Sequence, residues 1–154
     1  MKLVVAAVGQ RMPGWIEAGW AEYARRFPPH LSLDLIELPA AGRAGADGRA
    51  SELEGQRLLP RLPERAVAVA LHGSRQAWST ETLAEHLAGW LQDGDPVWFL
   101  IGGADGLAPA VLERCRLRWS LGPAVYPHML VRVIVAEQLY RASSLLSGHP
   151  YHRA

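Results

Sequence analysis

Residues 127–142 read PHMLVRVIVAEQLYRA, and this stretch decides how the C-terminal part of the chain folds. It is long enough for a helix despite its β-branched start, and Glu137 and Arg141 stand four residues apart in the order that stabilises one. Its apolar residues run nearly all the way round. We therefore expect this helix to pack on its own sheet and also on another subunit. A helix fully buried within the monomer is the alternative.

Upstream of this helix, short apolar runs alternate with amphipathic segments. β-Branched and apolar residues predict strands at residues 2–8, 31–38, 66–71, 97–101 and 117–121. Spacings of three and four, with the helix start and stop signals, predict helices at residues 13–27, 50–61, 79–93 and 109–116. The alternation indicates an α/β fold in which a mostly parallel sheet has helices on both faces.

Several single residues mark where these elements begin and end. Pro13 suits the first turn of the first helix. Ser79 can cap the start of the third helix, and Gly94 can close its end. Residues 40–48 hold three glycines and no periodicity, so they are expected to form a mobile loop.

The composition is that of one compact domain, residues 1–154, with 49% hydrophobic residues and six tryptophans. This excludes a disordered chain. The apolar run at residues 3–8 is too short for a signal peptide, and no run approaches the ~20 residues that span a bilayer, so a cytoplasmic protein with no membrane segment is expected. Cys115 is the only cysteine, which excludes an internal disulfide and a thiolate metal cluster and favours a buried structural thiol.

Three glycine-containing loops, residues 71–74, 101–106 and 121–127, directly follow predicted strands. Ligands of parallel sheets bind beyond the carboxyl ends of the strands, and glycines let the backbone approach them closely. Each loop alone could simply be a tight turn; together they favour a site for a small ligand. No G-x-G-x-x-G or G-x-x-x-x-G-K-[ST] spacing occurs, so a dinucleotide or triphosphate site is not expected.

The last residues, 148–153, place His149, Tyr151, His152 and Arg153 in a short segment. Such a mixture can stack on a base, bind a phosphate and transfer a proton. A disordered tail is the alternative that composition leaves open. A metal site at the two histidines is not expected, because the intervening Pro150 disrupts helical spacing and no carboxylate is near in sequence.

Three segments together resemble one family. The glycine loop that begins Leu100-Ile101-Gly102-Gly103, the helix at residues 127–142 and the terminus Pro150-Tyr151-His152-Arg153 are similar, in this order, to those of the RlmH family of SPOUT methyltransferases. Residues 1–27 resemble it too, so the similarity covers nearly the whole chain and is weakest at residues 40–65.

The resemblance implies a parallel sheet whose C-terminal segment is threaded into a trefoil knot, an exception to the rule that chains are unknotted. It also implies a homodimer that uses S-adenosyl-L-methionine (AdoMet) to methylate N3 of a pseudouridine in the 23S rRNA of assembled ribosomes. The net charge of only +1 agrees with recognition of a shaped particle, since it gives little grip on free nucleic acid. No metal is implied.

The resemblance also implies site residues. AdoMet contacts fall on Leu71 and Gly103, and on Gly122, Pro123, Ala124, Val125, Tyr126 and Pro127. The candidates for catalysis are His128, Arg132, Tyr151, His152 and Arg153. Among these, His152 or His128 is favoured for removing the N3 proton, and Arg153 or Arg132 for binding phosphate.

Two positions depart from the family pattern. The family commonly has an acidic residue where His72 stands and a threonine where Val125 stands. They keep open a second hypothesis, a ribosome-associated RNA-binding protein of the same fold that is not catalytic. A small nucleotide-binding oxidoreductase is a third hypothesis, and the missing dinucleotide fingerprint argues against it.

Overall fold

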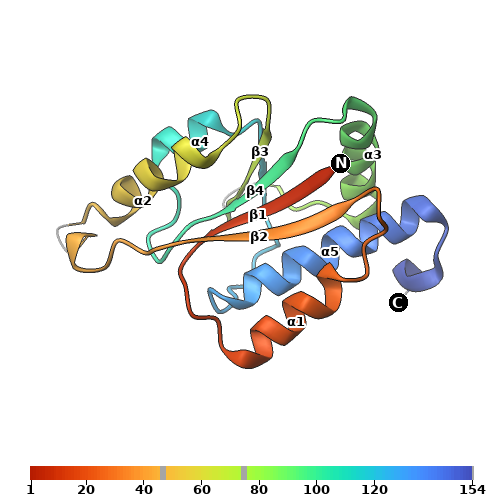
Figure 1. Cartoon of the computed structure of the whole chain (residues 1–154), viewed down its shortest axis with the longest axis horizontal. Coiled ribbons are helices and arrows are strands. Elements are labelled where there is room, and N and C mark those ends of the chain that lie inside the picture. The colour runs from red at the N-terminus through yellow and green to blue at the C-terminus, as the bar shows by residue number, and fades with distance from the viewer. Residues whose placement is uncertain (46–47, 74–75, 154) are drawn as a thin grey trace.

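The computed structural model describes residues 1–45, 48–73 and 76–153, and in this part of the chain all strands join one sheet (Figure 1). The strands are β1 (Lys2–Val8), β2 (Ser32–Leu38), β3 (Val67–Leu71), β4 (Val97–Ile101) and β5 (Leu117–Trp119). Their order across the sheet is β2-β1-β4-β3-β5, and every pairing is parallel. The prediction of a mostly parallel sheet is confirmed.

Helices cover both faces of this sheet, as predicted. They are α1 (Gly14–Ala24), α2 (Ala50–Leu58), α3 (Thr80–Asp93), α4 (Pro109–Arg114) and α5 (Leu130–Ser147), with 3-10 turns η1 (Gly42–Gly45), η2 (Leu59–Arg61) and η3 (Pro150–Arg153). Helices α1, α3 and α5 lie on one face, and α2 and α4 lie on the other (Figure 1).

The side chains of β4 show how the sheet divides the core. Val97, Phe99 and Ile101 pack among residues of α1, α3 and α5. Trp98 and Leu100 pack among residues of α2 and α4. Because successive side chains of a strand point to opposite faces, a strand buried on both faces is apolar throughout, as the sequence of β4 is.

The predicted cap residues of α3 are confirmed. Ser79 accepts a hydrogen bond from the backbone N–H of Thr82 at 3.1 Å, and Gly94 closes the helix with φ 83°. The helical pair of Glu137 and Arg141 also forms, with 2.6 Å between Arg141 Nη2 and Glu137 Oε1.

Other boundaries differ from the prediction. Pro13 stands just before α1 with ψ 148° and is not in its first turn. Helix α1 ends at Ala24, short of Phe27, since the residue before a proline avoids helical geometry. Helix α5 starts at Leu130 and continues to Ser147, where Gly148 takes the left-handed conformation with φ 75°.

Three further segments differ from the prediction: β5 and α4 are shorter, and part of the expected loop is regular. Strand β5 ends at Trp119 and α4 at Arg114, where Cys115 turns extended. Part of the expected loop at residues 40–48 is the regular turn η1. Residues 46 and 47 of that loop lie outside the described residues.

Helix α5 packs on its own sheet, as expected. Val135, Ala136, Leu139 and Ala142 are fully buried in the core beneath it. The helix is not fully buried, however, because its other apolar residues, including Val131, Val133 and Ile134, remain half-buried. The second contact expected of this helix, with another subunit, stays a prediction, and so does the trefoil knot.

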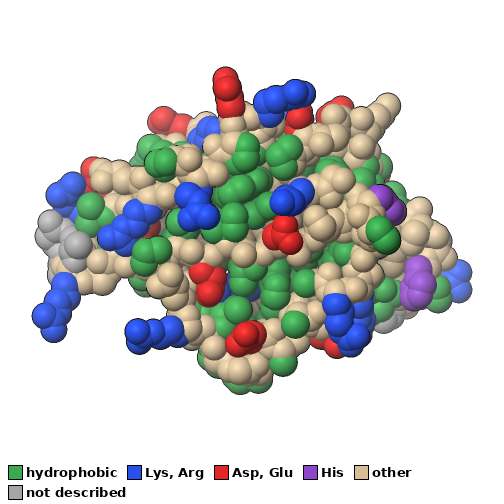
Figure 2. All heavy atoms as spheres, in the orientation of Figure 1, with side chains coloured by type: hydrophobic (Ala, Val, Ile, Leu, Met, Phe, Trp, Pro, Cys, Tyr) green, Lys and Arg blue, Asp and Glu red, His purple; other side chains and the backbone are tan. Residues whose placement is uncertain are grey.

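The surface is unevenly charged. Basic side chains, here arginines, gather at the left end of the face seen in Figure 2, where β1 and β2 finish. Among the residues that the structure describes, no helix is long and apolar enough to cross a membrane.

Candidate functional site

The carboxyl ends of four neighbouring strands form one edge at which the glycine loops meet. Ala7 pairs with Ile101, and Leu71 pairs with Trp119, so β1, β4, β3 and β5 finish at the same level. The backbone N–H of His72 donates to the Trp119 carbonyl at 2.9 Å, which joins the first loop to the third. The structure therefore places Leu71, Gly103 and the start of the loop at residues 122–127 at the same edge of the sheet, and their role in cofactor binding stays a prediction.

The loop after β4 closes into a tight turn. The backbone N–H of Gly106 donates to the Gly103 carbonyl at 3.0 Å, and Gly106 has φ 77°. A Cβ on Gly102 would lie 2.5 Å from the carbonyl carbon of Gly106. Only glycine fits position 102, because such a contact is far inside van der Waals distance.

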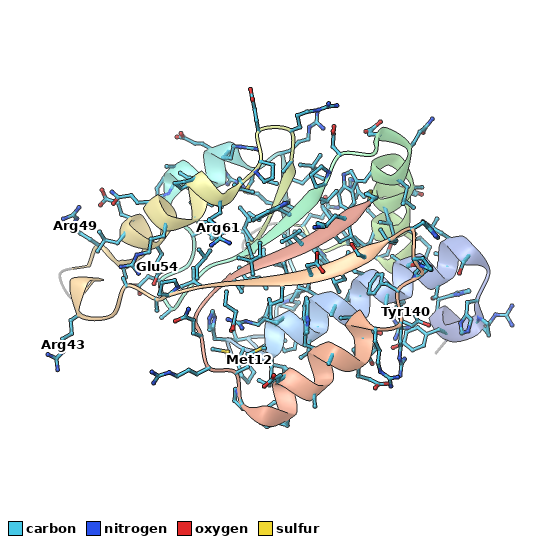
Figure 3. All side chains as sticks on the ribbon, viewed as in Figure 1. Met12, Arg43, Arg49, Glu54, Arg61 and Tyr140 are labelled. Carbon is cyan, nitrogen blue, oxygen red and sulfur yellow. The ribbon has the colours of Figure 1, made fainter. Side chains whose placement is uncertain are left out.

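Glu54, on α2, lies directly against this turn (Figure 3). Its side chain is buried at 6% exposure, and Oε2 accepts a hydrogen bond from the backbone N–H of Ala41 at 3.0 Å. Oε1 has no hydrogen-bond partner among the described residues, and a Cβ on Gly103 would lie 2.8 Å from it. Burying a carboxylate oxygen without a hydrogen-bond partner costs free energy. A bound group that donates a hydrogen bond to Oε1 would recover part of that cost.

Sequence reasoning missed Glu54, although one signal could have found it. Glu54 and Leu58 stand four residues apart on the buried face of α2, and Gly55 follows directly. A charged residue on an apolar helical face, beside a glycine in the helix interior, marks a close approach to another segment.

The loop after β5 exposes its backbone. Ser120 Oγ accepts from the N–H of Gly122 at 3.1 Å, and Gly122 has φ 102°. Val125 is 97% exposed and Tyr126 is 36% exposed. A cavity of about 170 Å³ adjoins Tyr126 and lies between this loop, Trp119 and Ile134. It is smaller than the roughly 300–1,000 Å³ of most ligand sites.

His128 follows this loop, and its ring contacts the end of β1. Nε2 lies 2.7 Å from the Val8 carbonyl oxygen, which can only accept, so Nε2 carries the hydrogen. In the neutral ring Nδ1 then holds the lone pair. Since the residue is exposed, Nδ1 can take a proton from a group in solution.

Arg132 is fully buried, which differs from the phosphate contact expected of it. Nη1 lies 2.5 Å from Glu37 Oε2, and Nη2 donates to the Gly9 carbonyl at 2.8 Å. A phosphate does not reach this guanidinium in the described arrangement. Arg132 instead fixes the chain just after β1, beside His128.

The terminal residues form the regular turn η3, not a disordered tail. The hydroxyl of Tyr151 donates to Glu137 Oε1 at 3.1 Å and lies 3.2 Å from the hydroxyl of Tyr23. Burial, the Tyr23 hydroxyl and the Glu137 carboxylate raise the pKa of Tyr151 well above its usual range. Tyr151 therefore stays protonated and serves as a donor, not as a base.

His152 and Arg153 do not meet the glycine loops within one chain. His152 Nδ1 donates to the His149 carbonyl at 2.6 Å, which leaves the Nε2 lone pair in the neutral ring. The turn follows the end of α5 and folds back along the helix, so that Tyr151 contacts Glu137 near its middle, whereas His128 precedes its start. The predicted catalytic residues thus form two groups, one at the start of α5 and one in the turn that follows it.

Comparison with known proteins identifies the family. Residues 1–152 match a family model described as "Predicted SPOUT methyltransferase". The chain belongs to the SPOUT methyltransferase family. It is 53% identical over its full length to a protein of Alkalilimnicola ehrlichii named "Ribosomal RNA large subunit methyltransferase H", with all of both chains covered. Proteins of the same name from Azotobacter vinelandii and Pseudomonas putida are 48% and 46% identical, over 99% of this chain and all of theirs.

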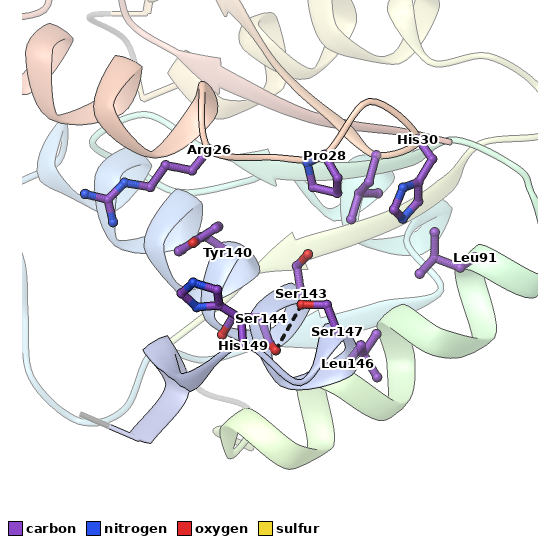
Figure 4. Close-up of a pocket in the computed structure, with 11 residues that line it drawn as sticks. Arg26, Pro28, His30, Leu91, Tyr140, Ser143, Ser144, Leu146, Ser147 and His149 are labelled. Atoms are coloured by element: carbon purple, nitrogen blue, oxygen red, sulfur yellow. Dashed lines mark hydrogen bonds between the residues drawn. The ribbon is translucent and has the colours of Figure 1, made fainter.

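This SPOUT methyltransferase also has a larger hollow, of about 500 Å³, at the amino ends of its strands. Arg26, Tyr140 and His149 lie on one side of it, and His30 and Leu91 lie on the other (Figure 4). None of the predicted cofactor residues lines it. Within residues 1–45, 48–73 and 76–153, no group of histidine, cysteine and carboxylate side chains could hold a metal ion.

Proposed function

We propose that this SPOUT methyltransferase uses AdoMet to methylate N3 of a pseudouridine in 23S rRNA, in assembled ribosomes of the cytoplasm. The observation that supports this most is identity of 46–53% along the full chain with proteins named ribosomal RNA large subunit methyltransferase H. The convergence of the glycine loops at one sheet edge agrees with it.

The residues at this edge fit AdoMet in three respects. The turn at Gly102 and Gly103 leaves no room for side chains, the loop from Gly122 to Pro127 is exposed, and Glu54 keeps one oxygen unpartnered beneath Gly103. Leu71, Gly103 and residues 122–127 would hold the cofactor through close approach of the backbone. When bound, AdoMet supplies an electrophilic methyl group.

The chain's own groups then bind the base, orient it and accept its proton. An imide N–H is weakly acidic, so its removal needs a nearby base. His128 Nδ1 and His152 Nε2 both carry a lone pair in the neutral ring, as their hydrogen bonds to carbonyls require. Arg153, which is exposed, would bind a phosphate, and Tyr151 would donate a hydrogen bond. Positioning supplies most of the rate.

The site requires a second subunit. The tail follows α5 and the predicted cofactor loops precede it, and within the described residues the side chain of Tyr151 contacts Tyr23, Glu137 and Tyr140 and not those loops. A homodimer whose two α5 helices lie antiparallel would place each tail beside the partner's loops. The half-buried apolar residues of α5 support such a contact. The trefoil knot implied by the resemblance belongs to this proposal.

A non-catalytic RNA-binding protein is the second candidate, on the strength of the departures at His72 and Val125. The side chain of Val125 is 97% exposed, so neither valine nor threonine at this position contacts the rest of the chain. The departure at Val125 therefore leaves the fold of the loop unaffected. Calorimetric titration with AdoMet separates the two functions, with NAD as the control ligand. We expect saturable binding of AdoMet alone. No binding of AdoMet would favour the non-catalytic protein, and NAD should not bind.

A further inference from the structure

Exposed arginines flank the carboxyl edge of the sheet on the side of β1 and β2. Arg11 stands three residues after the end of β1, and Arg43 lies in η1, five residues after the end of β2. Arg57 reaches the same place from α2, since its Nη1 donates to the carbonyls of Pro39 and Ala40 at 3.0 and 3.1 Å. The ends of β1 and β2 adjoin, because Val8 pairs with Leu38.

The positive charge of this surface is not neutralised within the described residues. Neither Arg11 nor Arg43 forms an ion pair there. Of the nearest carboxylates, Glu37 is paired with Arg132, and Glu54 is buried. Figure 2 shows the resulting group of basic side chains, and Figure 3 shows Arg43 projecting from the tip of the molecule. With a net charge of +1 for the whole chain, this is a local concentration of charge.

The backbone at Arg11 is strained. Within the described part of the chain, Arg11 is the one non-glycine residue with a positive φ, 65°. Left-handed geometry disfavours side chains with a Cβ, and glycine would relieve it. Strain of this kind persists where a side chain is needed at that place.

The segment that carries Arg11 is clamped to the candidate catalytic group. The N–H of Gly9 donates to the Leu38 carbonyl at 2.7 Å, and the Gly9 carbonyl accepts from Arg132. The carbonyl of Val8 accepts from His128 Nε2. Gly9 is therefore held beside His128, and Arg11 follows it by two residues on the exposed surface.

We propose that Arg11, with Arg43 and Arg57, forms the surface that binds backbone phosphates of the 23S rRNA around the target nucleotide. This rests on the proposed function. A guanidinium group can bind two phosphate oxygens at once, and three such groups along one edge suit a chain of phosphates better than a single anion. On this proposal, the backbone strain at Arg11 is retained because its guanidinium group contacts the RNA.

Ribosome binding, measured by sedimentation over a range of salt concentrations, tests this without requiring methyl transfer. Arg11→Ala and Arg11→Gly should bind ribosomes about tenfold more weakly, with the salt slope reduced by roughly one. Arg11→Lys should restore most of the affinity. Arg11→Gly should also raise the melting temperature above that of Arg11→Ala, because it removes the strain. AdoMet affinity should be unchanged in all three.

Arg116→Ala is the matched control, since it removes an exposed arginine before β5, at the amino ends of the strands. It should bind ribosomes like the unaltered protein. Equal binding by Arg11→Ala and the unaltered protein would overturn the proposal, as would an equal loss in Arg116→Ala. If the unaltered protein binds ribosomes but transfers no methyl group, the proposed function is wrong. The effect of the Arg11 variants on ribosome binding can still be measured in that case.

Discussion

Gly103 has no side chain, and this allows the turn after β4 to pack directly on the carboxylate of Glu54. Gly103→Ala would place a methyl group 2.8 Å from Glu54 Oε1, so either the turn or the carboxylate must move. We expect a loss of stability of about 1–3 kcal/mol, as for other overpacked sites, and weaker AdoMet binding. Chemical denaturation and calorimetry measure the two effects.

The double variant Gly103→Ala with Glu54→Ala shows whether the carboxylate is the cause. Removing it should recover part of the AdoMet affinity lost in Gly103→Ala. Additive losses in the double variant would mean that Glu54 does not set the size limit at position 103.

The ion pair of Arg132 and Glu37 should stabilise the region after β1. Glu37→Gln removes the charge that neutralises a fully buried guanidinium. The expected loss is about 3 kcal/mol, at the low end for buried pairs, because the Glu37 side chain is 31% exposed. Denaturant unfolding measures it, with Glu52→Gln as an exposed control. If Glu37→Gln lowered the free energy of unfolding by no more than Glu52→Gln does, the assigned role of Arg132 would be wrong.

The thiol of Cys115 should respond to pH in a defined direction. Burial raises its pKa to about 11, against the weaker opposing effects of Arg114 and Arg118. A raised pKa means that the thiol's contribution to stability is complete below the unfolded pKa of about 9 and is lost as pH rises towards 11. Relative to Cys115→Ala, the protein should lose stability over this window in unfolding experiments. Parallel curves for the two proteins would show that burial does not perturb the thiol.

Sequence reasoning predicted loops at the strand ends, which the structure places at one sheet edge, but it misjudged Arg132 and missed Glu54. Leu71, Gly103 and residues 122–127 could be predicted because they follow apolar runs, a local property. Arg132 could not, because its partner Glu37 is 95 residues away in sequence and only the fold brings them together. Glu54 was missed for the same reason, since its environment is made by Ala41 and Gly103.

Among the elements, strands were predicted more accurately than helix ends. The bounds of β1 and β4 match the prediction, because both are apolar runs buried on two faces. Helix α5 extends five residues beyond its predicted end at Ala142, and η3 then folds back so that Tyr151 contacts Glu137 and Tyr140. These tertiary contacts leave no local signal in the sequence.

The separation of η3 from the cofactor loops leads to a prediction about subunits. A chain that lacks residues 149–154 and a chain with Gly103→Ala should each be nearly inactive as homodimers. Mixed dimers should regain methyl transfer, because one of their two sites combines intact loops with an intact tail from the partner. Co-expression with two affinity tags isolates the mixed dimer for assay.

A tail that acts within its own chain would predict no recovery in the mixed dimer. Recovery in a mixture of homodimers that cannot exchange subunits would likewise argue against a shared site. The tail-deleted protein should still bind AdoMet, since Leu71, Gly103 and residues 122–127 remain.

At the scale of the whole molecule, the low net charge agrees with the proposal that the assembled ribosome is the substrate. The net charge of +1 is too small to bind naked RNA strongly, and several exposed arginines lie near the carboxyl ends of β1 and β2. The sequence predicted the fold class and a second subunit from the pattern of α5. It could not show that the tail folds back onto Glu137 and Tyr140, away from the predicted cofactor loops, because that depends on how the chain packs.

The central claim is methylation of a pseudouridine in the ribosome. Purified protein should be incubated with labelled AdoMet and with ribosomes that contain, or lack, the pseudouridine. The account predicts label in the 23S rRNA of the first sample only, at N3 of that base by mass spectrometry of the nucleosides. Label in neither sample, or equal label in both, would contradict it.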